Sequence, residues 1–422
     1  MILTPGTVAV LLASATAAEP IPTSQAAAAF SEMRAACAAD GGRLWKRDLC
    51  GPVVFVDPQT RMFVADREAP VDAKLKGGLF LGRLPSEMNA ANTAVEWGGG
   101  RWTMVLWPLP SDKADRLGLL MHEAFHRVQP DLKIPMRSPV PAHLADANGR
   151  AGMRMEWRAL AAALSAADDA ARRTAIADAL AFRAWRRSLA PDAGRLENDL
   201  ELNEGLAEYT GQKLSGRPDA EKHAASALAR AEGQESYARS FAYASGPAYG
   251  LLLDRYEPGW RGRISQASDL GQMLAAAVRP SVPDWKAAGA RYGFDQVLAE
   301  EAAAAAERDR QAAQWRAKLV DGPVLRLPFG QMQIQFDPGK LFPLQEHGTV
   351  YPALRITDAW GVLEVKEGAL VDGSWSGVRV VAPSGAAETG QLSGPGWTLK
   401  LAPGWRLRPG ARAGDFTIAK AE

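Results

Sequence analysis

The chain changes character near Ser111 and again near Asp321, and these two changes limit its fold more than any single motif does. Between them, Ala-rich segments carry apolar residues at helical spacing. On either side, short β-branched or alternating runs are separated by Gly and Pro, which is typical of strands and turns. We therefore expect an α+β protein with a small α+β unit over residues 19–109, a mainly helical domain over 110–320, and a β-rich domain over 321–422, built as a sandwich or barrel.

The local pattern predicts individual elements within these parts. Ser111 is the expected N-cap of a buried helix that continues past Phe125, and Gly246-Pro247 is expected to interrupt a later helix. The other expected helices cover residues 24–40, 151–189, 196–214, 219–233, 237–254 and 292–318. The expected strands include residues 52–57, 61–65, 101–107, 324–327, 333–336 and 397–401.

Charge and composition exclude one broad class of function. Lys and Arg are spread along the chain, and the formal net charge is +1. A nucleic-acid-binding surface would require a basic stripe or patch. With 47% hydrophobic and 23% charged residues, the chain has the composition of an ordinary globular protein. We expect no nucleic-acid partner.

The first part of the chain has the features of an export signal. Residues 1–18 carry no charge, and an apolar run over residues 8–13 is followed by small residues that resemble a cleavage site. We expect a signal peptide over residues 1–18 and an exported protein, periplasmic or extracellular. The usual Lys or Arg at the start is missing, so either the start is displaced or the signal is weak. No later apolar run is long enough for a membrane helix, so the mature chain should have no integral membrane segment.

Two cysteines, Cys37 and Cys50, flank the turn Gly41-Gly42. Their even count and close spacing, together with expected export, favour a disulfide. Its closure is worth about 3 kcal/mol in the chain-entropy treatment. The alternative is a pair of free buried thiols. Zinc ligation is disfavoured, because the spacing fits no zinc-finger pattern and no His lies nearby.

The residues His122-Glu123-Ala124-Phe125-His126 lie within the expected buried helix. Histidines at i and i+4 project from one helix face, about 5–6 Å apart at Cβ, so both imidazoles can reach one zinc ion at about 2.0–2.1 Å. Glu123 points to the side, where it can hold a water instead of ligating the metal. The alternative is two unrelated helix histidines beside a glutamate. The chain has only 5 His, and buried His and Glu need partners, so we favour a Zn²⁺ site.

A catalytic zinc needs a third protein ligand and an open position. The residues after His126 do not continue the H-E-x-x-H-x-x-G-x-x-H pattern, and His143, His223 and His347 lie in no such motif. The segment Asn203-Glu204-Gly205-Leu206-Ala207 resembles instead the N-E-G-F-A segment of the aminopeptidase N type. That type belongs to the gluzincin metallopeptidases, which also include thermolysin. The resemblance implies a zincin-like catalytic domain in which Glu204 is the third metal ligand.

Glu208 follows Glu204 by about one helical turn, so it can accept a hydrogen bond from a ligating His and fix its tautomer. Gly205 would allow a neighbouring helix to approach closely. The alternative is that Glu197, Glu201, Glu204 and Glu208 form a solvated acidic stripe, which is common on surface helices. The His-Glu motif in the preceding helix favours ligation over the stripe.

The resemblance covers about residues 101–255 and departs from the family in one respect. Gluzincins place the third ligand much closer to the second His than Glu204 lies to His126. We therefore expect inserted helices around residues 133–195 between the two ligand helices, and a divergent member of the group. The N-terminal and C-terminal segments resemble no family.

Two further features follow from the same resemblance. Tyr243 begins a segment similar to the Y-x-x-G of aminopeptidases, whose Tyr stabilises the oxyanion, so the resemblance implies that role for Tyr243. Tyr249 and Tyr237 are the next candidates, and a tyrosine packed in the core is the alternative. The strand at 101–107 matches the position where gluzincins place an edge strand, which can pair with an extended peptide.

Together these features predict a zinc metallopeptidase acting on a peptide or protein substrate. Zn²⁺ held by His122, His126 and Glu204 would activate a water, and Glu123 would act as general base. One alternative is an exported hydrolase that cleaves cell-wall amides at the same site. Another is a non-catalytic zinc-containing protein whose C-terminal domain recognises a partner. Exopeptidase and endopeptidase activity both remain open.

Overall fold

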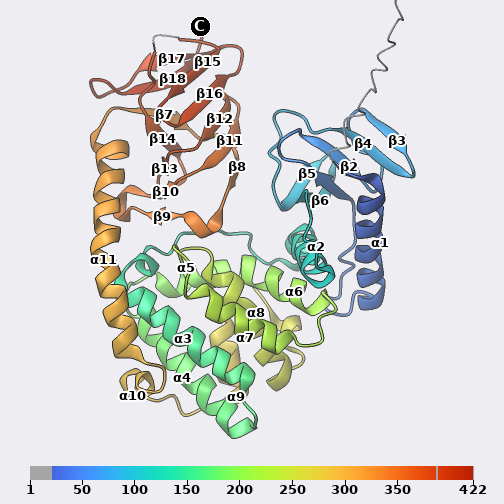
Figure 1. Cartoon of the computed structure of the whole chain (residues 1–422), viewed down its shortest axis with the longest axis vertical. Coiled ribbons are helices and arrows are strands. Elements are labelled where there is room, and N and C mark those ends of the chain that lie inside the picture. The colour runs from blue at the N-terminus through green and yellow to red at the C-terminus, as the bar shows by residue number, and fades with distance from the viewer. Residues whose placement is uncertain (1–20, 386–387, 422) are drawn as a thin grey trace, which may run out of the picture.

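The computed structural model describes residues 21–385 and 388–421, so the expected signal peptide lies outside the described residues. Within them the protein is an α+β structure (Figure 1). In this view an N-terminal sheet and a C-terminal pair of sheets both stand above a group of packed helices. None of the helices in the described ranges is long and apolar enough to cross a membrane.

The N-terminal part is a sheet covered on one face by helix α1 (Thr23–Asp40). The strand order is β3-β4-β2-β1-β6-β5. Phe30 of α1 stacks on Phe55 of the sheet, with ring centroids 4.3 Å apart. The strands are β1 (Val53–Val56), β2 (Met62–Ala65), β3 (Ala73–Lys76), β4 (Leu79–Arg83), β5 (Thr93–Trp97) and β6 (Gly100–Leu106).

The expectation that residues 101–107 form an edge strand is wrong. Strand β6 lies inside the sheet, because it pairs in parallel with β1 and antiparallel with β5. The outermost strand on this side, among the described residues, is β5. Strand order depends on pairing between distant segments, here Val53 with Thr103, which the local pattern does not reveal.

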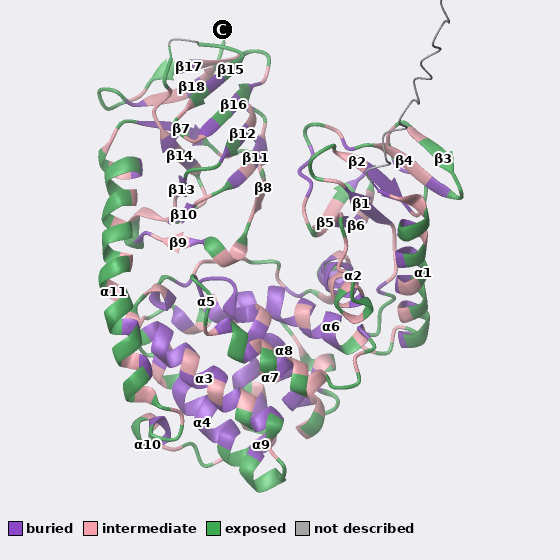
Figure 2. Ribbon diagram, in the orientation of Figure 1, coloured by how far each residue is buried: buried purple, intermediate pink, exposed green. Residues whose placement is uncertain are grey.

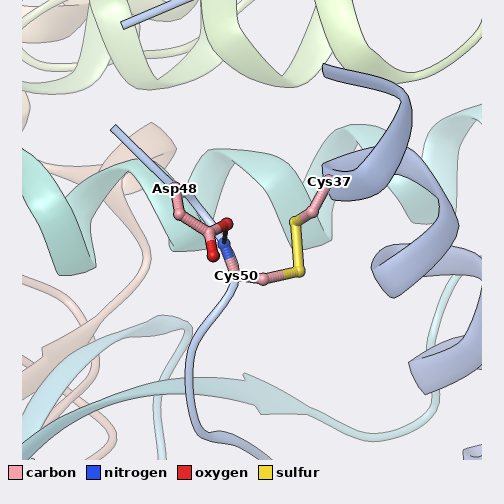
Figure 3. Close-up of side chains that lie close together, drawn as sticks. All are labelled: Cys37, Asp48 and Cys50. Atoms are coloured by element: carbon pink, nitrogen blue, oxygen red, sulfur yellow. Dashed lines mark hydrogen bonds between the residues drawn. A yellow bond between two sulfur atoms is a disulfide. The ribbon is translucent and has the colours of Figure 1, made fainter. Parts of the chain in front are cut away.

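Cys37, near the end of α1, forms a disulfide with Cys50 in the loop before β1 (Figure 3). Asp48 lies beside the pair and accepts a hydrogen bond from the backbone N–H of Cys50, at 2.9 Å. The three side chains are close enough to hold an ion, but the bonded sulfurs are not thiolates, which are the form of Cys that ligates metals. The disulfide therefore has the expected structural role and ties α1 to the loop that leads into the sheet.

The central part is a set of packed helices whose facing sides are buried (Figure 2). One continuous hydrophobic core joins α1, the inner face of the sheet and these helices. The helices are α2 (Lys113–Val128), α3 (Ala147–Ser165), α4 (Asp169–Arg187), α5 (Ala193–Leu200), α6 (Leu206–Leu214), α7 (Ala220–Ala231), α8 (Phe241–Tyr256), α9 (Leu270–Val278), α10 (Trp285–Gly289) and α11 (Phe294–Arg316). Single turns also occur, at η1 (Gln129–Leu132), η2 (Ala142–Ala145), η3 (Glu201–Gly205), η4 (Trp260–Arg263) and η5 (Ala317–Asp321).

Three local expectations for the helices are corrected. Asp112, not Ser111, caps α2, because its carboxylate accepts from the backbone N–H of Asp115 at 2.9 Å. The single helix expected over 151–189 is two helices, since Asp168 caps a new start by accepting from Ala171 N–H. Pro247 lies inside α8 without ending it. The buried surroundings of α8 keep it helical despite the missing backbone donor.

The C-terminal part consists of two sheets that share one hydrophobic core, as in a β-sandwich. Strand β16 illustrates the alternation, since Trp397, Leu399 and Leu401 are buried and the residues between them are exposed. The first sheet has the order β17-β18-β7-β14-β13-β10-β9, and the second β15-β16-β12-β11-β8. The strands are β7 (Val324–Pro328), β8 (Gln333–Phe336), β9 (Phe342–Pro343), β10 (Thr349–Tyr351), β11 (Leu354–Asp358), β12 (Gly361–Val365), β13 (Ala369–Val371), β14 (Gly377–Val381), β15 (Gln391–Gly394), β16 (Trp397–Leu401), β17 (Trp405–Pro409) and β18 (Phe416–Lys420). Two further turns are η6 (Pro338–Lys340) and η7 (Gln345–His347).

Candidate metal centre

Two chain segments that are distant in sequence carry the expected metal ligands side by side. Helix α2 supplies His122 and His126, and the π-helical turn η3, between α5 and α6, supplies Glu204. Helices α2 and α6 meet at Gly118 and Gly211, where a Cβ on Gly211 would lie 2.4 Å from the Gly118 carbonyl oxygen. Helix α8 meets η3 in the same way, because a Cβ on Gly246 would lie 2.2 Å from the Gly205 Cα. These contacts need glycine, as expected for Gly205.

The ligand atoms of the three side chains converge on one point. The Nε2 atoms of His122 and His126 are 3.2 Å apart, and Glu204 Oε2 lies 3.6 Å from the first and 3.4 Å from the second. All three residues are buried. Three ligands held at about 2.0–2.1 Å from a tetrahedral zinc ion would lie roughly 3.3–3.4 Å from one another. The spacing of these atoms therefore fits a zinc ion.

Hydrogen bonds on the far side of each imidazole fix which nitrogen faces the shared point. His122 Nδ1 lies 3.0 Å from Glu208 Oε2, and His126 Nδ1 lies 2.8 Å from Gln129 Oε1. The amide nitrogen of Gln129 donates to the carbonyl of Pro135, which leaves its oxygen for the histidine. Both Nδ1 atoms therefore carry the proton, and both Nε2 lone pairs point at the space beside Glu204. This is the arrangement of a metal ligand oriented by a neighbouring acceptor.

Glu204 is held so that only one of its oxygens faces the histidines. Oε1 accepts from Arg239 Nη2 at 2.9 Å and from Asn203 Nδ2 at 3.3 Å. Oε2 faces the two imidazoles and accepts from the Tyr243 hydroxyl at 2.7 Å. A carboxylate fixed in this way can bind a metal through a single oxygen, which leaves another coordination position for water.

The same convergence changes the pKa values of His122 and Glu204. Burial alone would lower the pKa of His122, but hydrogen bonds with Glu204 and Glu208 outweigh it and raise the pKa well above its usual value. Burial alone would raise the pKa of Glu204, but hydrogen bonds with His122 and His126 hold it well below its usual range. The site thus attracts a positive charge to the point between its lone pairs, and a proton and a metal ion compete for that point.

Glu123 lies beside the ligands but is not one of them. It is buried, yet its Oε2 has no hydrogen-bond partner among the described residues. Burial raises the pKa of its carboxyl, although the nearby His122 and His126 oppose the shift. A buried carboxylate oxygen without a partner is costly, so this oxygen calls for a ligand or a water as its partner.

The three expected ligands and Glu123 line one cavity of about 640 Å³, together with Glu208, Arg239 and Tyr243. Its floor is formed by α2 and η3, with His122, Glu123 and Glu204. One side comes from the N-terminal part, next to β5, and the other from strand β8 of the C-terminal part, with Phe336. The three parts of the chain therefore enclose the candidate metal centre together.

Of the three candidate tyrosines, one lies in the cavity and two lie outside it. Tyr243 lines the cavity and stacks on the His122 ring, with centroids 5.6 Å apart and planes at 5°. The hydroxyls of Tyr249 and Tyr237 instead donate to Glu156 and to the Glu232 carbonyl, away from the ligands.

The remaining histidines lie outside the ligand group. His143 binds Glu197 in the helical core, His347 lies in the C-terminal part, and His223 lines the cavity wall. The solvated acidic stripe is contradicted, because Glu197, Glu201 and Glu204 are buried.

Sequence reasoning missed three residues that support the site, Gln129, Ser138 and Arg239, and gave no role to Asn203. Gln129 lies three residues after His126, so helical spacing could have suggested it. Asn203 links Gln129 to Glu204. Arg239 and Ser138 contact one another at 3.1 Å. They reach the site from segments with no local motif, so no sequence signal marks them.

Comparison with known proteins adds no identification: no protein-family model, curated protein or solved structure matches this chain.

Proposed function

We propose that this protein is a zinc-dependent metallopeptidase. The observation that carries the proposal is the combination of three converging ligand atoms with an unpartnered carboxylate oxygen on Glu123 in the same cavity. His122, His126 and Glu204 would hold the ion. When bound, zinc polarises the scissile carbonyl and lowers the pKa of a water toward about 7. The buried histidine pair and single carboxylate match the ligand set of catalytic zinc sites.

The residues around the ion supply the proton transfers and the positioning. Glu123 Oε2, which has no partner among the described residues, takes the proton from the attacking water and delivers it to the leaving nitrogen. Its raised pKa suits a group that must both accept and release a proton. The Tyr243 hydroxyl, 2.7 Å from Glu204 Oε2, is close enough to the reacting centre to donate to the developing oxyanion.

The relation to gluzincins forms part of the same proposal. It is supported by the position of Glu204 in the turn η3, directly before helix α6, which packs against α2, and by Glu208 as the acceptor for His122. Helices α3 and α4 lie in the long segment between His126 and Glu204, as expected for an insertion. The disulfide supports export, because such bonds persist in oxidising compartments.

The test combines metal analysis with a digest of a random linear peptide library. Purified protein should hold about one zinc per chain, and Glu123→Gln should keep the zinc while cleaving peptides about 10²- to 10⁴-fold more slowly. Glu307→Gln, an exposed glutamate on α11, serves as the matched control and should cleave at the wild-type rate. The proposal fails if the protein holds no zinc, or if Glu123→Gln cleaves as fast as wild type.

A further inference from the structure

A network of hydrogen bonds joins the loop before β5 to the C-terminal sheet. Asn89, which is 5% exposed, donates its backbone N–H to Gln333 Oε1 at 3.0 Å and its side-chain amide to the Arg355 carbonyl at 3.4 Å. Arg355 donates to the Ser86 carbonyl at 3.2 Å and to Asn89 Oδ1, and Thr357 also donates to Asn89 Oδ1. We call these five residues the bridge.

The bridge borders the cavity that contains the candidate metal centre. Two residues beyond Asn89, the chain begins to line the cavity at 91–93. One residue beyond Gln333, strand β8 does the same through Ile334 and Phe336. The cavity thus has α2 and η3 as its floor, and residues 91–93 at the start of β5 and strand β8 as its flanks. The bridge links these two flanks just outside the cavity lining.

Both flanking strands are the outermost of their sheets among the described residues. An outermost strand has backbone N–H and C=O groups without a strand partner, and an extended peptide can pair with them. Figure 1 shows β5 and β8 facing each other above α2 and α6. The lining between them includes apolar side chains such as Leu106, Met136 and Phe336, which can pack against substrate side chains.

We propose that the substrate of this site is a single extended segment of a flexible or unfolded polypeptide, held between β5 and β8. The inference rests on the metallopeptidase function proposed above and gives its substrate class. A cavity of about 640 Å³ takes only a few residues at a time. Because the bridge joins the two flanks, a folded domain or a small closed peptide ring cannot lie across the metal centre.

The first test measures binding without turnover. Zinc-loaded Glu123→Gln protein is mixed with the best-cleaved linear peptide of the library, or with the tightest-binding member if none is cleaved. Amide hydrogen exchange should slow in both β5, residues 93–97, and β8, residues 333–336. The proposal is overturned if β8 amides gain no protection at saturating peptide, or if no linear peptide binds.

The second test uses two phenylalanines of the C-terminal sheets. Phe336 lines the cavity, whereas Phe416 is similarly half-buried in β18 and lies outside the cavity lining. Because an aromatic contact is worth about 1.5–3 kcal/mol when fully buried, Phe336→Ala should raise KM for the linear peptide by about tenfold or more. Phe416→Ala should leave KM unchanged. Equal KM values for the two variants would contradict the proposal.

The third test opens the bridge. Wild type should cleave a linear peptide at least about 100-fold faster than the same sequence closed by a disulfide, since such a ratio needs only about 2.7 kcal/mol. The double variant Asn89→Ala, Arg355→Ala should reduce that ratio. Arg412→Ala, which removes donors to the Val320 and Asp321 carbonyls outside the cavity lining, should leave the ratio unchanged. Equal cleavage of ring and linear peptide by wild type overturns the proposal.

The outcomes separate this inference from the function on which it rests. Zinc content and the loss of activity in Glu123→Gln test the metallopeptidase alone. Slower amide exchange in both strands without any hydrolysis would support the peptide-binding cleft and contradict the catalytic function. Hydrolysis that depends on Glu123 but is unaffected by changes at Phe336 and the bridge would support the metallopeptidase function and contradict the peptide-binding cleft.

Discussion

Two groups of buried charges lie only a few turns apart in the helical part, and they differ in how completely they are paired. In the first, both Glu197 oxygens accept from two donors each: Oε1 from Arg186 and His143, and Oε2 from Arg186 and Arg187. In the second, Glu123 Oε2 has no partner among the described residues, and two imidazole lone pairs face Glu204.

The difference shows how structural and functional charges can be told apart within one helix bundle. Arg183, Arg186 and Arg187 come from α4 and meet Glu156, Glu197 and Glu201 from α3, α5 and η3, so the first group joins several helices internally. Because both oxygens of Glu197 are already used, this carboxylate offers nothing to a ligand. The metal centre has acceptors in excess, which only an added cation or proton donor can satisfy.

The largest expected effect separates the two groups through stability. Glu197→Gln should lower the free energy of unfolding by about 3–5 kcal/mol, because it leaves Arg186 buried without its full counter-charge. Glu123→Gln is the same change at a buried carboxylate whose Oε2 has no partner among the described residues, and it should leave that free energy unchanged or raise it. Urea unfolding of both metal-free variants checks this pair. Equal losses of stability would mean that the two carboxylates do not differ in how completely they are paired.

The second prediction concerns metal affinity. Glu204→Gln should weaken zinc binding by more than about 100-fold, a larger loss than the 10- to 100-fold typical for residues that only orient a ligand. Glu201→Gln, one helical turn earlier and in the group paired with arginines, should bind zinc as tightly as wild type under conditions in which this variant is folded. Competition with a chromophoric chelator measures both affinities. An unchanged affinity in Glu204→Gln would remove it from the ligand set.

A smaller effect is expected one layer further from the metal. Glu208→Gln keeps the shape of the side chain but weakens the acceptor for His122 Nδ1. We expect zinc affinity to fall by about 10- to 100-fold, with little change in the unfolding midpoint of the metal-free protein. The same chelator titration measures it, with Glu221→Gln on α7, outside the cavity lining, as control. A loss as large as that of Glu204→Gln would place Glu208 among the ligands.

The last prediction uses acid. Burial alone would raise the pKa of Glu197, but Arg186, together with His143 and Arg187, holds this pKa well below its usual range. A carboxyl with a lowered folded-state pKa stabilises the fold above about pH 4.5, and this contribution is lost as pH falls toward the folded pKa. Wild-type stability should therefore fall below that pH, by up to about 1.4 kcal/mol per pH unit from this one group. Glu197→Gln should show a shallower acid dependence.

The parts of the site that helical periodicity controls were predictable from sequence. His122 and His126 share a face because they lie four residues apart in α2. Glu204 and Glu208 have the same spacing across η3 and the start of α6. The position of β5 at the edge, and the approach of β8 to the cavity, depend on pairing between distant segments. Arg239 reaches Glu204, and Ser138 reaches Arg239, through tertiary packing, so no local pattern could identify them.

The glycine contacts beneath the metal centre have a consequence for how it responds to its ion. Gly118 against Gly211 sets the spacing of α2 and α6 backbone to backbone, and Gly205 against Gly246 holds η3 on α8 in the same way. At these contacts no side chain that could change rotamer lies between the segments. The ligand atoms are then held near their final separation before any ion arrives. Such a preorganised site reorganises little on binding, so removing and restoring the metal should leave the surrounding helices in place.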